Sequence, residues 1–331
     1  MEGRNVNTFS RFNNVNYFTT SFLTIKEDPH RKAGLITATL LCTATFISAQ
    51  EPPKTPIIAD TAWRITVTSG LTATQNAYSD NWTGGELGSV SWAFTSQTEA
   101  GRQLSPKLNS TTVLKLAFGQ TLTQSRVFDS ALNKEVARWS KPAKSTDLID
   151  LESVLRFTLQ KVVDPYLAFR TETQFYDGSN PAKKLFLSPM KLTESGGLLR
   201  VFKDDPKSYT LKSRLGFAVR QIITKVVDAK SISTNDGGLE SVTDFKAQLS
   251  KSVTYNSKLS VYKALFFSKS DLDTAGNWKS VDLNWEHLVG ASITKYLQTT
   301  LYFQLLYDKE IDSEIRIKET LGLGLSWKFS K

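Results

Sequence analysis

The sequence of 331 residues carries a formal net charge of +9, from 41 Lys and Arg against 32 Asp and Glu. A positive balance suits either nucleic acid or a surface of anionic lipid, but no basic run or helix-turn-helix pattern supports a nucleic-acid partner. The single cysteine, Cys42, excludes an intrachain disulfide and a site built from several thiolates. We therefore expect no nucleic acid and no cofactor.

The first 49 residues have the layout of a leader with a secretory signal peptide. A basic cluster, His30 to Lys32, precedes the uncharged apolar stretch 33–47, and Ser48 and Ala49 supply small residues before a cleavage point. The apolar stretch is shorter than the roughly 20 residues of a membrane-spanning helix. An uncleaved anchor and lipidation of Cys42 remain alternatives. Residues 50–62 are expected to form a short periplasmic segment.

From Trp63 onward the chain alternates apolar and polar residues with the period of a β-strand. The closing stretch illustrates this, because Leu321, Leu323, Leu325 and Trp327 share one face and glycines lie on the other. Twelve strands are predicted: 63–74, 87–101, 108–122, 149–159, 167–176, 191–203, 211–220, 239–251, 258–268, 281–289, 297–307 and 320–329. An even number of strands places both ends of the chain on the same side of the membrane.

The connections between these strands alternate in length. Long connections are predicted at 76–86, 123–146, 177–190, 224–238, 271–277 and 308–314, and short ones at 102–107, 161–165, 204–208, 252–257 and 293–295. This is typical of an outer-membrane barrel with periplasmic turns and extracellular loops. A β-sandwich and a lipocalin-type barrel with an apolar interior also alternate. Strand lengths of 10–14 residues favour the membrane barrel, which needs about 9–11 per strand.

Four short motifs occur in a fixed order along this region. They are Asn81-Trp82-Thr83-Gly84-Gly85, 146–151 (TDLIDL), Thr173-Gln174-Phe175 and Leu187-Ser188-Pro189. In this order they resemble an uncharacterised Bacteroidota outer-membrane β-barrel family, and the resemblance covers most of 63–329. It implies an export signal and an outer-membrane location, and it brings no catalytic or ligand-binding residue. The prediction is an all-β, antiparallel, up-and-down transmembrane β-barrel of about 12 strands, formed by residues 63–331.

Aromatic residues lie near the predicted strand ends, where amphipathic rings favour the headgroup level of a bilayer. The predicted interface aromatics are Trp63, Tyr166, Tyr209, Trp278, Tyr296, Tyr307, Trp327 and Phe329. Outer-membrane lipid and lipopolysaccharide are therefore expected partners, together with the barrel-assembly machinery during biogenesis.

The polar faces of the strands carry charges of both signs. The lumen-facing candidates are Arg64, Lys115, Asp150, Glu152, Arg156, Arg170, Glu172, Lys212, Arg214, Arg220, Asp282, Glu286 and Lys318. Opposite charges that face each other across a lumen pair and hydrogen-bond. They form either a salt-bridged or solvated lumen without a specific substrate, or a selective pore whose constriction is set by Arg156, Arg170, Glu172 and Arg214.

Enzyme chemistry has little support in the sequence. Beyond the leader the one histidine is His287, which alternation places beside Trp285 on the apolar face, and no G-x-S-x-G, H-E-x-x-H or Walker pattern occurs. We expect no enzyme and no metal site. The preferred function is a narrow channel or transporter for small polar solutes. A structural or surface-interaction barrel acting through loops 123–146 and 177–190 is the alternative, and a membrane-embedded hydrolase ranks third.

Overall fold

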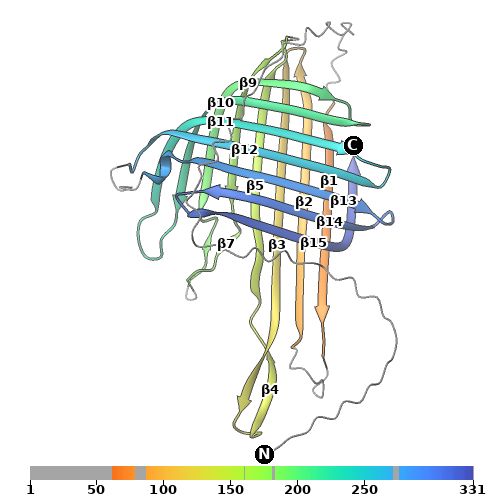
Figure 1. The fold of residues 1–331 in the computed structure, drawn as a ribbon, viewed down its shortest axis with the longest axis vertical. Coiled ribbons are helices and arrows are strands. Elements are labelled where there is room, and N and C mark those ends of the chain that lie inside the picture. The colour runs from red at the N-terminus through yellow and green to blue at the C-terminus, as the bar shows by residue number, and fades with distance from the viewer. Residues whose placement is uncertain (1–61, 79–86, 160, 181–182, 271–275, 331) are drawn as a thin grey trace, which may run out of the picture. The chain divides into compact units, whose positions relative to one another are not determined.

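The computed structural model describes residues 62–78, 87–159, 161–180, 183–270 and 276–330 (Figure 1). The predicted leader 1–49, most of the predicted periplasmic segment 50–62 and the motif Asn81 to Gly85 lie outside the described residues.

Twelve antiparallel strands form one closed barrel, as the sequence predicted. They are β1 (Arg64–Asn76), β2 (Ser89–Ser105), β3 (Leu108–Asp129), β5 (Ala143–Phe157), β6 (Asp164–Thr173), β9 (Met190–Asp204), β10 (Tyr209–Thr224), β11 (Ile232–Gln248), β12 (Val253–Phe267), β13 (Val281–Ser292), β14 (Leu297–Asp308) and β15 (Asp312–Ser330). Each strand pairs with its neighbours in the sequence, and β1 closes the ring by pairing with both β2 and β15.

The apolar faces of the strands point outward. Leu71 of β1 lies opposite Phe94 of β2 and Leu325 of β15, and all three side chains are exposed. Leu321 and Leu215 are 72% and 61% exposed on the same outer surface. Closure gives each strand a partner on both sides, over residues 66–72 and 324–330 in the case of β1 and β15, and such pairing is the condition for placing a sheet in hydrocarbon. The predicted outward faces are therefore confirmed.

Two of the predicted long connections are shorter than predicted, and the alternation of long and short fails at the first of them. The connection predicted as 308–314 is a tight turn of three residues, 309–311, and that predicted as 224–238 shrinks to 225–231. The strands continue because backbone pairing needs no apolar side chain once the chain has left the apolar band, so Ser233 and Asn235 still pair with β10.

The predicted loop 123–146 is in part an ordered β-hairpin. β3 continues past its last pair with β2 at Thr123, and its residues up to Asp129 pair with β4 (Lys134–Trp139), which projects at the lower end of Figure 1. The turn is stabilised by Asp129, whose carboxylate accepts hydrogen bonds from the N–H groups of Ala131 and Leu132. The hydrogen bond from the Ala131 N–H, together with the one from the Arg138 guanidinium, holds the pKa of Asp129 below its usual value. The predicted loop 177–190 also contains structure, since β7 (Tyr176–Asp177) pairs with β8 (Leu185–Phe186).

Two predicted interface aromatics lie elsewhere. Tyr166 is 2% exposed inside the barrel, with the guanidinium of Arg214 5.6 Å from its ring centre, because Leu167 and Phe169 take the outward positions of β6. Trp278, in the short 3-10 helix η1 (Asn277–Lys279), packs against the buried cluster of Ala218, Tyr262 and Ala264. The remaining six are at least partly exposed: Trp63, Tyr209, Tyr296, Tyr307, Trp327 and Phe329.

Candidate functional site: a charged lumen

Strand register brings acids and bases onto one inner surface. Lys115 of β3 lies opposite Asp150 of β5, Asp150 lies opposite Glu172 of β6, and Glu152 lies opposite Arg170. Arg170 reaches diagonally, and its Nε lies 2.8 Å from Asp150 Oδ1 while its terminal nitrogen lies 2.7 Å from Glu172 Oε2. The two-residue period of the strands thus gathers charges of both signs on one inner surface, with Arg170 between the carboxylates of Asp150 and Glu172.

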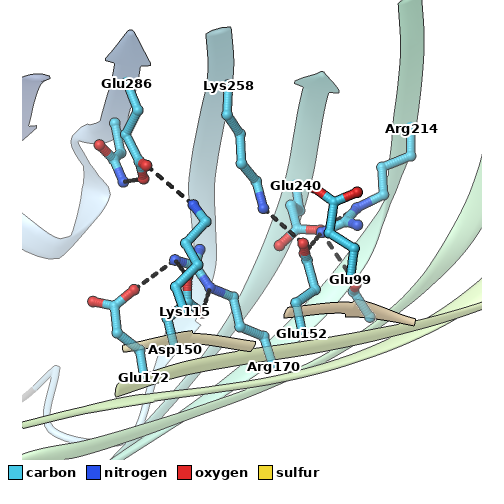
Figure 2. Close-up of polar contacts among 12 residues, drawn as sticks. Glu99, Lys115, Asp150, Glu152, Arg170, Glu172, Arg214, Glu240, Lys258 and Glu286 are labelled. Atoms are coloured by element: carbon cyan, nitrogen blue, oxygen red, sulfur yellow. Dashed lines mark hydrogen bonds and ion pairs between the residues drawn. The ribbon is translucent and has the colours of Figure 1, made fainter. Parts of the chain in front are cut away.

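Ion pairs also join strands that are not neighbours. Lys115 Nζ of β3 lies 3.3 Å from Glu286 Oε2 of β13, although four strands separate β3 from β13 around the shorter way of the barrel. Lys258 of β12 lies 2.6 Å from Glu152 of β5, again across four intervening strands (Figure 2). Such contacts pass through the barrel interior. The polar faces therefore point inward, which excludes the lipocalin-type alternative.

A third pair spans the widest separation that the ring allows. Lys246 of β11 contacts Glu99 of β2 at 2.6 Å, with five strands between them in either direction. Glu152 also accepts a hydrogen bond from Arg214, and Arg214 lies 3.4 Å from Glu240 of β11. We name the residues Glu99, Lys115, Glu152, Arg214, Lys246, Lys258 and Glu286 the cross-lumen network. Opposite charges offset one another within it, so each charge keeps a partner in a confined space.

A second ionic group lies nearer the end of the barrel that carries the β3–β4 hairpin. Arg220 contacts Asp236 of β11 and Asp282 of β13, each at 2.7 Å, and its guanidinium lies 3.6 Å from the ring centre of Tyr262. The Tyr262 hydroxyl donates to Asp236 at 2.5 Å. Arg220 and Asp236 are 6% and 4% exposed, so this group fills the lumen on the side of β10 to β12.

The other predicted lumen residues lie apart from these groups. Arg156 is 3.9 Å from Asp164 and lies apart from the ion pairs of Arg170, Glu172 and Arg214, the other residues of the predicted constriction. Lys212 lies 3.6 Å from Asp204 next to a short turn. Lys318 lies over the ring of Tyr302 at 5.9 Å, and Arg64 begins β1 opposite Gly101.

Sequence reasoning missed Lys258, Glu240, Asp236 and Tyr262. Glu240 lies on the same face of β11 as Lys246, and Lys258 lies on the inward face of the paired strand β12. The two-residue period alone could therefore have identified both. Asp236 was missed because it fell in a predicted loop.

The inward side chains of one half of the barrel are closely packed. We call β5, β6 and β9 to β12 the packed wall, because many of its inward residues are buried. They are Asp150, Glu152, Tyr166, Thr193, Ser195, Leu199, Arg214, Ala218, Arg220, Asp236, Val242, Tyr262 and Ala264. Side chains therefore fill much of this half of the lumen.

His287 lies on the outer surface, as predicted. Its ring centre is 4.5 Å from that of Trp285, and the Tyr255 hydroxyl lies 2.7 Å from its Nδ1. This contact gives Nδ1 of the imidazole a hydrogen-bond partner on an apolar surface. Within the described ranges, no group of three or more His, Cys, Asp or Glu side chains could hold a metal ion. No helix in the described part of the chain is long and apolar enough to cross a membrane.

Comparison with known proteins gives structural matches only. No protein-family model and no curated protein sequence matches the chain. An outer membrane channel from Pseudomonas putida F1 matches with a TM-score of 0.40 and 12% identity, covering 81% of this chain and 95% of that one. The NanC porin matches at 0.37 and 9%, covering 78% and 98%, and the translocator domain of the autotransporter NalP from Neisseria meningitidis at 0.33 and 8%, covering 81% and 88%. The fold assignment rests on the strand pairing itself.

Proposed function

We propose that this chain is a β-barrel of the bacterial outer membrane and that its lumen is a narrow channel for small polar solutes. The outer surface of leucine and aromatic side chains supports insertion into lipid, and the closed hydrogen-bond ladder removes the sheet edges that hydrocarbon cannot accommodate. Lipid and lipopolysaccharide would contact this surface, and the barrel-assembly machinery would insert it.

The cross-lumen network is the observation that carries the proposal of narrowness. A barrel of twelve strands encloses more space than inward side chains of ordinary length can fill. Here Lys115–Glu286 and Lys258–Glu152 span that width and leave only part of the cross-section to solvent. Fixed charges at a narrow point decide which solutes pass.

Planar-bilayer recording of the purified protein tests this proposal. We expect small, ohmic current steps, and larger steps from the double variant Lys115→Gln/Glu286→Gln, because it removes a contact that crosses the lumen. A matched control is Lys183→Gln/Asp228→Asn, which removes an exposed ion pair between two connections. Absence of current at every voltage would remove the channel function.

A second candidate function has its own supporting observation. The β3–β4 hairpin carries apolar side chains in solvent, with Phe128, Leu132 and Trp139 60%, 59% and 48% exposed. Exposed apolar side chains beyond a barrel rim suit a surface-interaction barrel. Deletion of 124–139 should then abolish aggregation of cells that express the protein and leave any conductance unchanged. Aggregation that persists without the hairpin would remove this candidate.

A further inference from the structure

Three consecutive strands have an inner surface unlike the packed wall. We call β14, β15 and β1 the open wall. Among the described residues of these three strands, Gly322 alone is buried. Thr68 of β1 is instead exposed, although it lies inward where β1 pairs with β15. Thr74 and Thr320 are also inward and exposed, in the part of β1 and β15 beyond Thr72 and Gly324, where these two strands no longer pair. Exposure of inward side chains requires free space beside them, so the unfilled part of the lumen adjoins this wall.

The middle of the open wall is uncharged and rich in hydroxyls. Its inward residues are Thr66, Thr68, Gly70, Thr72 and Thr74 on β1, Thr320, Gly322, Gly324 and Ser326 on β15, and Gln298, Thr300, Tyr302 and Gln304 on β14. The glycines keep the surface low. A Cβ on Gly322 would lie 3.0 Å from Thr300 Oγ1 and 3.1 Å from a methyl carbon of Thr72, so neighbouring short side chains close over the backbone there.

Two of the cross-lumen ion pairs border this space. Lys115 contacts Glu286, and Lys246 contacts Glu99, so each cation has an anion within 3.3 Å. A solute beside the open wall therefore meets a row of hydroxyls on one side and compensated ion pairs on the other. Hydroxyl groups both donate and accept hydrogen bonds, and they match a solute that also carries hydroxyls.

We infer that the solute path is eccentric, that it follows the open wall, and that it favours small neutral polyhydroxylated solutes. This inference rests on the proposed channel function and adds the route and the class of solute. The packed wall contributes no passage, because Ala218 and Val242 at its centre are 0% and 2% exposed. Lys318 and Arg316 are inward cations of β15 near one end of the route, and they are residues that could bias the route toward anions.

Cysteine modification tests the route. In a Cys42→Ser background of the full chain, Thr320→Cys and Thr74→Cys place a thiol on the open wall, and Ala218→Cys places one in the packed wall. A methanethiosulfonate carrying a trimethylammonium group should lower the single-channel conductance of the first two about twofold or more, with no change for Ala218→Cys. Mass spectrometry checks that the thiols at positions 320 and 74 have reacted and measures how far the buried thiol at position 218 has reacted, and heat-modifiable migration on gels checks that each variant has folded.

The possible results separate the two proposals. Absence of current from the unmodified protein would overturn the channel function itself. Normal current that is unaffected by complete modification at both Thr320→Cys and Thr74→Cys would overturn the route and leave the channel function standing. Current that falls when Ala218→Cys reacts would also overturn the route.

Liposome swelling tests the class of solute. We expect arabinose to enter about threefold faster or more than glutamate and lysine, which are of similar size and opposite charge. Lys318→Gln should leave the arabinose rate unchanged. If glutamate entered faster than arabinose, and if Lys318→Gln removed that difference, the neutral class of solute would be overturned and the route would be shown to select anions.

Discussion

Neutralising Glu152 should destabilise the barrel more than any substitution on its rim. The carboxylate contacts Lys258 Nζ at 2.6 Å and Arg214 at 2.5 Å, and Glu152 is 9% exposed. Glu152→Gln keeps the shape of the side chain and leaves both cations without this anion. Removing one partner of a buried pair costs about 3–5 kcal/mol, and we expect the lower end, about 3 kcal/mol, because Arg214 retains Glu240.

Urea unfolding of the purified barrel in lipid vesicles, followed by tryptophan fluorescence, measures this change. The free energy of unfolding should recover partly in Glu152→Gln/Lys258→Gln, because the double variant no longer holds an unpaired ammonium, and the double-mutant cycle gives the coupling energy. The control is Glu135→Gln on β4, where the side chain is 62% exposed and lies 3.9 Å from Arg126. It should change stability by no more than about 0.5 kcal/mol.

Unchanged stability of Glu152→Gln would refute the reasoning. It would mean that lumen water hydrates Lys258 and Arg214 well enough to replace the carboxylate, so that the cross-lumen network contributes no net stabilisation. The same variant would then be expected to leave the conductance unchanged as well.

Three further predictions follow from the outer surface, the rim and the ion pairs. Leu323→Arg should cost roughly 2–4 kcal/mol if the residue lies near the bilayer midplane, and Gln298→Arg on the inward face of the adjacent strand should cost less in the same unfolding assay. Partial desolvation at the rim and the carboxylate of Asp308 raise the pKa of Glu310 to about 7. Lowering the pH through 7 should therefore protonate Glu310 and reduce cation preference in bilayer recordings, and this pH dependence should be absent in Glu310→Gln. Arg156→Gln should leave ion selectivity unchanged, because Arg156 lies beside Asp164 and apart from the cross-lumen network.

The sequence was sufficient for the strands and for which face of each points inward. Alternation is a local property, so Leu321 and Leu323 could be placed outward, and Asp150 and Arg170 inward, from their spacing alone. The sense of the barrel followed from strand length rather than from the pattern. Extension of β3 beyond Thr123 was not predicted, since Val127 and Phe128 are adjacent and break the alternation. Asp129 and the left-handed Asn133, with a φ of 49°, mark its turn.

Contacts across the lumen could not be predicted in the same way. Lys115 and Glu286 are 171 positions apart, and their meeting depends on the stagger that accumulates over every strand pair between them. The bulge between Gly237 and Gly238, where β11 pairs with β12, adds one residue to that stagger. A charged residue that is known to point inward therefore has several possible partners at a similar level along the barrel axis. Only the closed barrel determines which of them it contacts.

The two halves of the lumen differ because one is lined by long charged side chains and the other by short polar ones. Long acidic and basic side chains reach the middle of the barrel from β3, β5 and β10 to β13, and each needs a partner there because an unpaired charge in a confined space is costly. If the middle of β1 and β15, between Arg64 at one end and Lys318 at the other, also carried long charged side chains, these would need partners in the same volume and the passage would close. Threonine, serine and glycine on those strands satisfy the hydrogen bonding of solvent without reaching across. Thr320→Arg should therefore reduce conductance without unfolding the barrel. A barrel that has only a structural role conducts no current, and the substitution would then have no such effect.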